Sequence, residues 1–97
     1  MNCKEVAVFK FREECIDGAI ALNKKLISEM QKESNNTLIN FEVLQSLKDP
    51  SILTWLIEWT DSMSAKDTTD KWLSFPSNQE FSSSVEQDIF YDFFEKT

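Results

Sequence analysis

Residues 38–59 read LINFEVLQSLKDPSILTWLIEW, and this stretch decides the fold. Apolar and polar side chains alternate over Leu38–Leu47, which is the pattern of a strand with one buried face. The segment Lys48–Ser51 contains a proline at a position that favours a turn. Ile52–Trp59 is then rich in β-branched and aromatic residues, which favour strands. The stretch therefore predicts an antiparallel β-hairpin.

The residues before this hairpin predict a strand followed by a long helix. Val6–Phe11 is rich in β-forming residues and is bounded by charge, so we expect a strand there. From Glu13 to about Glu33 the period changes, and apolar residues recur three and four positions apart, as on one face of a helix. Asn35 and Asn36 follow Ser34, and asparagine tolerates the left-handed backbone that ends helices.

The residues after the hairpin predict a second helix. Asp61 or Ser62 can cap its start, because both side chains accept hydrogen bonds from free backbone N–H groups. The helix is expected over about Met63–Phe75. Pro76 would end it, because proline lacks the N–H group that a helix interior needs.

A short helical turn through Phe81 and Val85 and a final strand over Ile89–Phe94 complete the order of elements. The sequence thus predicts an α+β fold of the ferredoxin-like βαββαβ type, with a four-stranded antiparallel sheet. Residues 1–97 have a typical length for one domain, and no internal repeat is visible. We therefore expect a single domain.

Two helices cover only one face of a four-stranded sheet. The apolar content of the other face therefore indicates whether a second copy must cover it. One face is expected to carry Ala7, Phe9, Phe11, Ile39, Phe41, Val43, Leu53, Trp55, Ile57 and Trp59. The opposite face also carries large aliphatic side chains, namely Val6, Val8, Leu38, Leu44, Ile52 and Leu56. Soluble monomers rarely expose such a patch, so we expect a homodimer that packs sheet against sheet. The alternative is that some of these residues lie under loops at strand ends.

Composition limits the partners. The formal net charge is −7, with 17 acidic and 10 basic residues and no histidine. Such a surface repels nucleic-acid phosphates and anionic membranes, and no apolar run is long enough to cross a bilayer. Without histidine, and with two cysteines only, a metal site is not expected. The cysteines are expected to be reduced and structural, which fits a cytoplasmic protein.

Three short motifs carry a resemblance to a known family. They are the Asp49-Pro50 turn, the strand end Ile57-Glu58-Trp59-Thr60-Asp61, and the segment Trp72-Leu73-Ser74-Phe75-Pro76 that leads towards Phe81. Together with the order of elements, they make the chain similar to the antibiotic-biosynthesis-monooxygenase-like group of dimeric α+β barrels. The resemblance spans nearly the whole chain.

The resemblance implies a monooxygenase that oxidises a small aromatic or quinol-type substrate with O₂, without a metal or flavin cofactor. A haem-degrading branch of the same group uses an asparagine, a tryptophan and a histidine, and the lack of histidine here disfavours that reaction. The alternative function is a non-catalytic homodimer that binds a ligand or regulates. A fold alone does not separate the two.

The candidate ligand-binding residues combine aromatic and polar groups. Trp72 is expected to stack on a planar ligand, and Glu58 would accept a proton if it were buried. Tyr91 could donate a hydrogen bond to a substrate oxygen. Each of these residues also has a simpler reading as a core or surface residue. The full candidate set is Trp72, Trp59, Phe9, Phe41, Phe75, Glu58 and Asn40.

Overall fold

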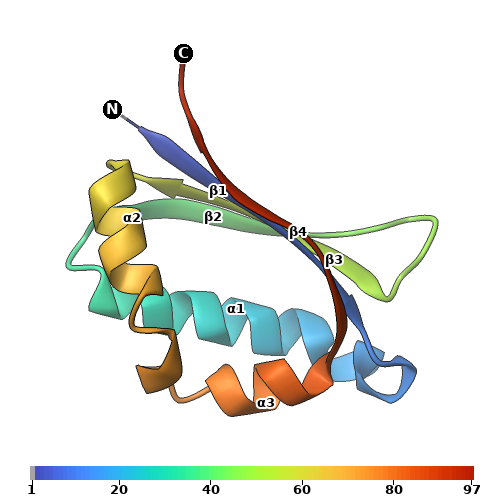
Figure 1. Cartoon of the computed structure of the whole chain (residues 1–97). Coiled ribbons are helices and arrows are strands. Elements are labelled where there is room, and N and C mark those ends of the chain that lie inside the picture. The colour runs from blue at the N-terminus through green and yellow to red at the C-terminus, as the bar shows by residue number, and fades with distance from the viewer. Residues whose placement is uncertain (1) are drawn as a thin grey trace.

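Four antiparallel strands form one sheet in the order β2-β3-β1-β4 (Figure 1). This computed structural model describes residues 2–97. The two chain ends lie together, because β1 and β4 are neighbours and Lys96 N donates to Asn2 O at 3.2 Å. The strands are β1 (Cys3–Phe11), β2 (Leu38–Gln45), β3 (Ile52–Trp59) and β4 (Val85–Glu95).

All helices lie on the same side of the sheet (Figure 1). The predicted ferredoxin-like α+β fold is therefore confirmed, with one difference in how its second helical region is divided. The helical elements are η1 (Glu13–Cys15), α1 (Ile16–Glu33), α2 (Ser62–Thr69), η2 (Trp72–Ser74) and α3 (Asn78–Ser84).

Helix α1 is the longest helix and contributes most of the helical half of the core. Its buried stripe repeats at helical spacing, as predicted. At its end, Asn35 and Asn36 adopt φ angles of 56° and 70°, the left-handed backbone expected of asparagine here. Ser34 Oγ also accepts a hydrogen bond from Leu38 N at 3.1 Å, so the turn into β2 is tied to the helix end. The buried stripe comprises Ala19, Leu22, Asn23, Leu26, Ile27 and Met30.

The hairpin forms as predicted, with one irregularity at its start. β3 has the predicted bounds, and β2 ends two residues earlier than expected. The register of the two strands shifts between Leu38 and Asn40. Leu38 is therefore buried whereas Ile39 is 48% exposed, the reverse of the predicted assignment of these two residues to faces. That prediction is wrong because a bulge displaces the alternation by one residue.

The second helical region is shorter than predicted. Asp61 is the cap, and its Oδ1 accepts a hydrogen bond from Ser64 N at 2.7 Å. Helix α2 then ends at Thr69 rather than at Phe75. Thr68 and Thr69 are poor helix formers, and Thr69 Oγ1 bonds back to Lys66 O at 3.2 Å, which competes with the helix.

The last strand begins four residues before its predicted start. Residues 86–88 are polar and show no strand pattern, so the sequence did not predict this part of β4. It forms a strand because it pairs with β1, with Val85 opposite Phe11. Two register shifts within this pairing bend β4 around the end of β1. The predicted helical turn through Phe81 forms α3, and Val85 is already the first residue of β4.

The sheet face without helices is partly apolar, as the sequence predicts. Phe90 and Phe94 of β4 stack there, with ring centroids 6.1 Å apart, and they are 43% and 45% exposed. They lie beside Val8, which is paired with Phe90 on one side and Thr54 on the other. Within residues 2–97, no helix is long and apolar enough to span a lipid bilayer.

Candidate functional site

A cavity of about 810 Å³ lies between the sheet and the helices. This volume is within the range of small-molecule sites. The cavity is bounded by β1, β3 and β4 on the sheet side and by α1, α2, η2 and α3 on the other. Its apolar lining is Phe9, Met30, Trp55, Trp72, Phe81, Val85 and Phe93, and its polar lining is Glu5, Lys66, Thr69, Asp70, Ser82, Glu86, Gln87, Asp88 and Tyr91.

The apolar wall is a cluster of aromatic rings centred on Phe81. The centroid of this ring lies 5.1 Å from that of Phe9, 5.5 Å from that of Trp55 and 5.6 Å from that of Trp72. Phe9 and Trp72 meet it edge to face, at interplanar angles of 88° and 84°. Each such pair contributes about 0.5–1.5 kcal/mol beyond area burial, so these contacts stabilise the wall of the cavity.

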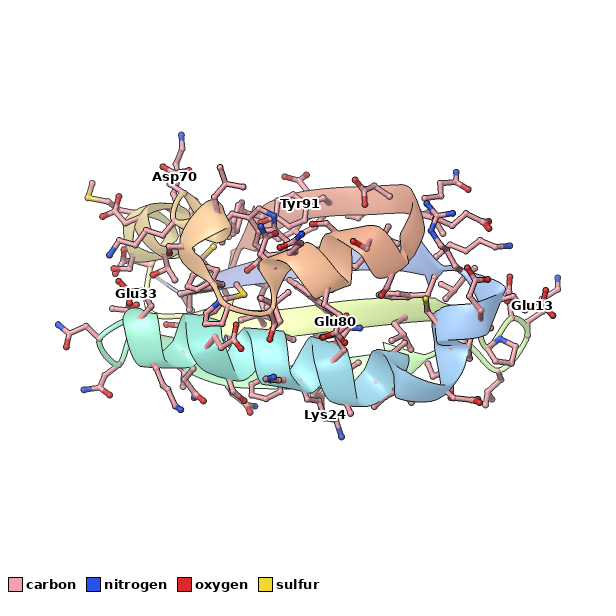
Figure 2. The ribbon with its side chains drawn as sticks, turned by 90° about the horizontal axis from the view of Figure 1, so that it is seen from below. Glu13, Lys24, Glu33, Asp70, Glu80 and Tyr91 are labelled. Atoms are coloured by element: carbon pink, nitrogen blue, oxygen red, sulfur yellow. The ribbon has the colours of Figure 1, made fainter. Side chains whose placement is uncertain are left out.

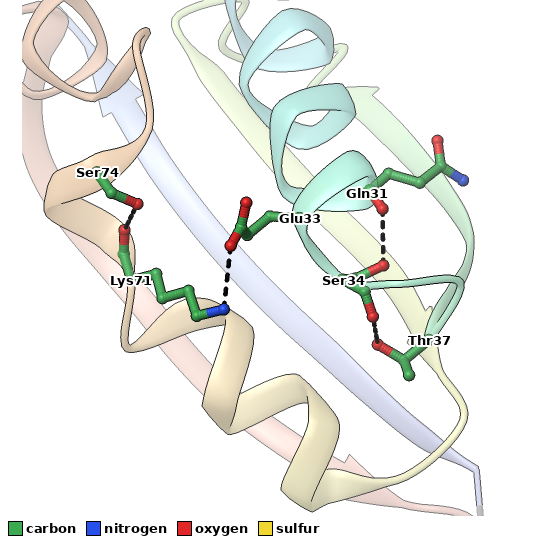
Figure 3. A network of polar contacts seen from close by, with 6 residues as sticks. All are labelled: Gln31, Glu33, Ser34, Thr37, Lys71 and Ser74. Carbon is green, nitrogen blue, oxygen red and sulfur yellow. Dashed lines mark hydrogen bonds and ion pairs between the residues drawn. The ribbon is translucent and has the colours of Figure 1, made fainter.

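Hydrogen bonds and one ion pair hold the segment that carries Trp72. Lys71 Nζ lies 3.0 Å from Glu33 Oε1 of α1, and Ser74 Oγ donates to Lys71 O at 2.6 Å (Figure 3). Glu29 of α1 accepts two further bonds from Ser77, at 2.9 Å from its N–H and 2.6 Å from its hydroxyl. The chain from η2 to α3 is thus attached to α1 on both sides of Trp72.

At the sheet side of the cavity lies a buried carboxylate, Glu5. It is fully buried, and each of its oxygens accepts one hydrogen bond. Tyr91 Oη donates to Glu5 Oε2 at 2.6 Å, and Trp59 Nε1 donates to Glu5 Oε1 at 3.0 Å. Tyr91 itself is 48% exposed, so it stands between Glu5 and the open part of the cavity.

Burial is the main cause of the raised pKa values of Glu5 and Tyr91. Loss of solvent raises the pKa of Glu5, and the hydrogen bonds from Tyr91 and Trp59 oppose that shift without cancelling it. Burial and the negative charge of Glu5 strongly raise the pKa of Tyr91, so its phenol stays protonated at neutral pH. Glu5 is therefore a carboxyl group of raised basicity, and Tyr91 is a neutral donor whose phenol oxygen can also accept a hydrogen bond.

This geometry can carry a proton between the cavity and Glu5. A hydroxyl group in the cavity can donate to Tyr91 Oη while Tyr91 donates to Glu5, which is a two-step relay into a buried base. Within residues 2–97, no three Cys, Asp or Glu side chains are arranged to hold a metal ion. Both cysteines are free, Cys3 buried in β1 and Cys15 half-buried before α1.

Two of the seven candidate residues line the cavity. Trp72 and Phe9 both contribute rings to its wall. Trp59 is fully buried outside the lining and donates its indole N–H to Glu5, so it touches the site through that carboxylate. Phe75 is buried behind Trp72, with the ring centroids 6.4 Å apart.

The other three candidates lie away from the cavity. Glu58 is on the uncovered sheet face, where its Oε2 accepts a hydrogen bond from Asn2 Nδ2 at 2.9 Å. Asn40 is exposed in β2, and its Oδ1 accepts from Phe41 N at 2.9 Å. Phe41 packs at the margin of the core on the same strand. The structure does not bring these three residues together with Trp72.

Glu5 was not among the predicted residues, although the sequence contains a signal for it. Extending the alternation of Ala7, Phe9 and Phe11 by one step towards the N-terminus places residue 5 on the core face. A glutamate on that face must be buried and hydrogen-bonded, which marks it as a candidate for a shifted pKa. The expected strand began at Val6 and so omitted it.

The comparison with solved structures identifies the class of fold. No family model matches this sequence, and no curated protein sequence does either. The chain nevertheless has the fold of the antibiotic-biosynthesis-monooxygenase-like proteins, because solved structures of that description match it over nearly its whole length.

Three solved structures illustrate the likeness. A conserved protein from Methanosarcina mazei Go1 is 25% identical, with a TM-score of 0.76, and the match covers 100% of this chain and 94% of the other. A candidate antibiotic biosynthesis monooxygenase from Bordetella bronchiseptica is 9% identical, with a TM-score of 0.81 and coverage of 99% and 97%. SnoaB, a cofactor-independent oxygenase from Streptomyces nogalater, is 9% identical, with a TM-score of 0.75 and coverage of 99% and 93%. Identities this low establish the fold and leave the reaction to the site itself.

Proposed function

We propose that this protein is a cofactor-independent monooxygenase that oxidises a small hydroxylated aromatic molecule, of the quinol or anthrone type, with O₂. The observation that carries the proposal is the 2.6 Å hydrogen bond from Tyr91 to Glu5 beside an aromatic cavity. The fold shared with SnoaB, described as a cofactor-independent oxygenase, supports it by analogy.

The first step is removal of a proton from the substrate. The hydroxyl of a quinol, or of the enol form of an anthrone, donates to Tyr91 Oη, and the Tyr91 proton passes to Glu5 Oε2. Glu5 becomes neutral, which removes the free-energy cost of holding a charge in a buried position. The substrate becomes an anion, and Tyr91 stabilises it by donating a hydrogen bond. The negative charge thus moves from the buried carboxylate to the aromatic substrate.

The second step transfers electrons from the substrate to O₂. For an anthrone, the anion gives one electron to O₂, and the resulting radical and superoxide combine to form a carbon–oxygen bond. The peroxide takes the proton back from Glu5. Its O–O bond and the C–H bond at the same carbon then break, giving a carbonyl group and one water molecule. One oxygen atom enters the product and the other leaves as water, so the substrate supplies all the electrons.

We also propose that two copies pack through the sheet face that carries no helix, in the cytoplasm. The support is the exposed apolar surface around the stacked Phe90 and Phe94 and the half-buried Val8 beside them. A two-fold contact covers the same patch on both copies, and it is the commonest symmetry of soluble oligomers. The two free cysteines fit a reducing compartment.

One observation favours the second candidate function, a ligand-binding module without catalysis. Both oxygens of Glu5 already accept a hydrogen bond, and within residues 2–97 every fully buried side-chain nitrogen or oxygen has a partner. Such a satisfied site can hold an aromatic ligand through its rings alone. The two functions share the cavity and differ only in whether Glu5 accepts a proton.

Oxygen uptake with a panel of quinols and anthrones separates the two functions. We expect uptake above the uncatalysed rate with the wild type, a fall of about 10²-fold or more in Glu5→Gln and Tyr91→Phe if the relay operates, and weaker binding in Trp72→Ala. Leu73→Ala is the matched control, because Leu73 is 87% exposed and does not line the cavity. Ligand binding without uptake across the panel would support the binding module instead.

A further inference from the structure

The rim of the cavity is strongly unbalanced in charge. Its charged lining, apart from the buried Glu5, consists of Asp70, Glu86, Asp88 and Lys66. Asp70 follows the last residue of α2, and Glu86 and Asp88 lie near the start of β4. Figure 2 shows Asp70 at the end of the helical segment and Tyr91 on β4, both seen from the helical side. Three carboxylates therefore face one ammonium group around the opening.

These three carboxylates are available to a ligand. In the described part of the chain, none of them lies within 4.0 Å of a Lys or Arg nitrogen, since the two ion pairs are Lys10–Asp49 and Lys71–Glu33. All three residues are exposed at the surface. The negative field also reaches inward, because Asp70 adds to the effect of Glu5 in raising the pKa of Tyr91. A charged group that enters this cavity therefore meets a net negative potential.

The aromatic wall favours the same sign of charge. The face of the half-buried Trp72 carries negative electrostatic potential, and cations bind to such faces. Trp72 is part of the wall on the same side as the end of α2. A cationic substituent on a ligand would thus be attracted by both the carboxylates and the rings.

We propose that the rim selects aromatic ligands by charge, so that a ligand with a protonated amine binds most tightly, a neutral one less tightly, and one with a carboxylate most weakly. This inference rests on the proposed function, since it describes the substrate of the same cavity. It narrows the substrate class to hydroxylated aromatics that are neutral or cationic. Hydroxyaryl acids are expected to bind most weakly and are therefore the least suitable substrates.

Calorimetric titration under nitrogen with three matched probes tests the proposal. The probes are 2-naphthol, its 6-aminomethyl derivative and its 6-carboxylate, which share one ring system and one hydroxyl. At low salt we expect the dissociation constant to rise about fivefold from the amine to the naphthol and about fivefold again to the carboxylate. At 1 M salt the steps should shrink to about twofold or less, because charges are screened within a few ångströms.

Two triple variants make the test specific. Asp70→Asn, Glu86→Gln and Asp88→Asn together should remove the ranking, so that the three probes bind with similar dissociation constants. The control variant, Glu13→Gln with Asp17→Asn and Glu42→Gln, loses the same number of charges from exposed positions outside the cavity and should keep the ranking.

The outcomes separate this inference from the proposed reaction. Equal binding of the three probes, or a ranking that survives in the rim variant, overturns charge selection while leaving the cavity as a binding site. The expected ranking without oxygen uptake supports charge selection and contradicts the oxygenase. Failure of all three probes to bind contradicts both.

Discussion

Tyr91 of β4 donates a 2.6 Å hydrogen bond to Glu5 of β1 across a diagonal of the sheet. In the register of the two strands, Glu5 lies opposite Phe93 and Tyr91 lies opposite Ala7. The small side chain of Ala7 leaves room for the phenol ring to lean towards Glu5. This contact joins residues 86 positions apart and places a buried base behind a polar group of the cavity.

Tyr91→Phe should destabilise the fold, because it leaves one oxygen of the buried Glu5 without a donor. We expect a loss of about 1–3 kcal/mol in the free energy of unfolding, measured by urea denaturation at pH 7. Leu73→Ala, at an exposed position outside the cavity, is the control and should cost about 0.5 kcal/mol or less. Equal losses in the two variants would mean that the hydrogen bond to Glu5 adds nothing to stability.

Because the pKa of Glu5 is raised in the folded protein, this residue makes the free energy of unfolding decrease as pH rises. A carboxyl group whose folded pKa lies above its unfolded value binds protons more tightly when folded, so its contribution is present at low pH. That contribution is lost as pH rises from the unfolded pKa, near 4.5, through the folded one. Asp49 and Asp61 have lowered pKa values and contribute with the opposite sign.

Comparison of the wild type with Glu5→Gln measures the contribution of Glu5 to the pH dependence of stability. We expect the stability of the variant, relative to the wild type, to increase as pH is raised from 4 to 8, because only the wild type must hold a buried charge at the higher pH. Urea denaturation of both proteins at several pH values measures this difference. Parallel stability curves for the two proteins would contradict a raised pKa for Glu5.

A second buried polar contact supports the floor of the cavity. Asn23 of α1 is fully buried, and its Oδ1 accepts a hydrogen bond from Trp55 Nε1 at 2.6 Å. Asn23→Ala removes this partner and leaves the indole N–H unsatisfied, which should cost about 1–3 kcal/mol of unfolding free energy. Lys24→Ala, at the neighbouring exposed position of the same helix, should change stability by about 0.5 kcal/mol or less. Thermal denaturation of the two variants checks the contrast.

The proposed dimer makes a prediction about one residue of the uncovered sheet face. Val8→Lys should convert the dimer into a monomer in light scattering, because it buries an unpaired charge in the contact. Lysine lowers the net negative charge, so general charge repulsion cannot account for dissociation. Leu47→Lys is the control, since Leu47 is fully exposed in the turn after β2. A wild type that is a monomer at micromolar concentration would contradict the contact.

Periodicity alone was enough to predict the hairpin and α1. The alternation in the hairpin and the apolar spacing of α1 arise from the burial of one face, and local sequence carries that information directly. The end of α1 at Asn35 and Asn36 was also predictable, because asparagine accepts a left-handed backbone. The extent of β4 depends on tertiary pairing. Pairing with β1 extends β4 to Val85 through polar residues that have no strand pattern of their own.

The site was only partly predictable for the same reason. Trp72 and Phe9 carry their own signal, since large aromatic residues at core positions line cavities. The hydrogen bond between Glu5 and Tyr91 forms only because β1 pairs with β4. Neither stretch of sequence alone indicates that these two residues meet. Glu58 had the residue type of a proton acceptor, but the pleat of β3 places it on the opposite face of the sheet from the cavity.

The central claim is that Glu5, acting through Tyr91, takes a proton from a hydroxyl group bound in the cavity. The most direct measurement is the absorption spectrum of bound 4-nitrophenol at pH 6 without oxygen, because its anion and neutral form differ in colour. The wild type should show the bound anion, and Glu5→Gln should show the neutral phenol at the same occupancy. Identical spectra of the bound phenol in the two proteins would contradict the claim.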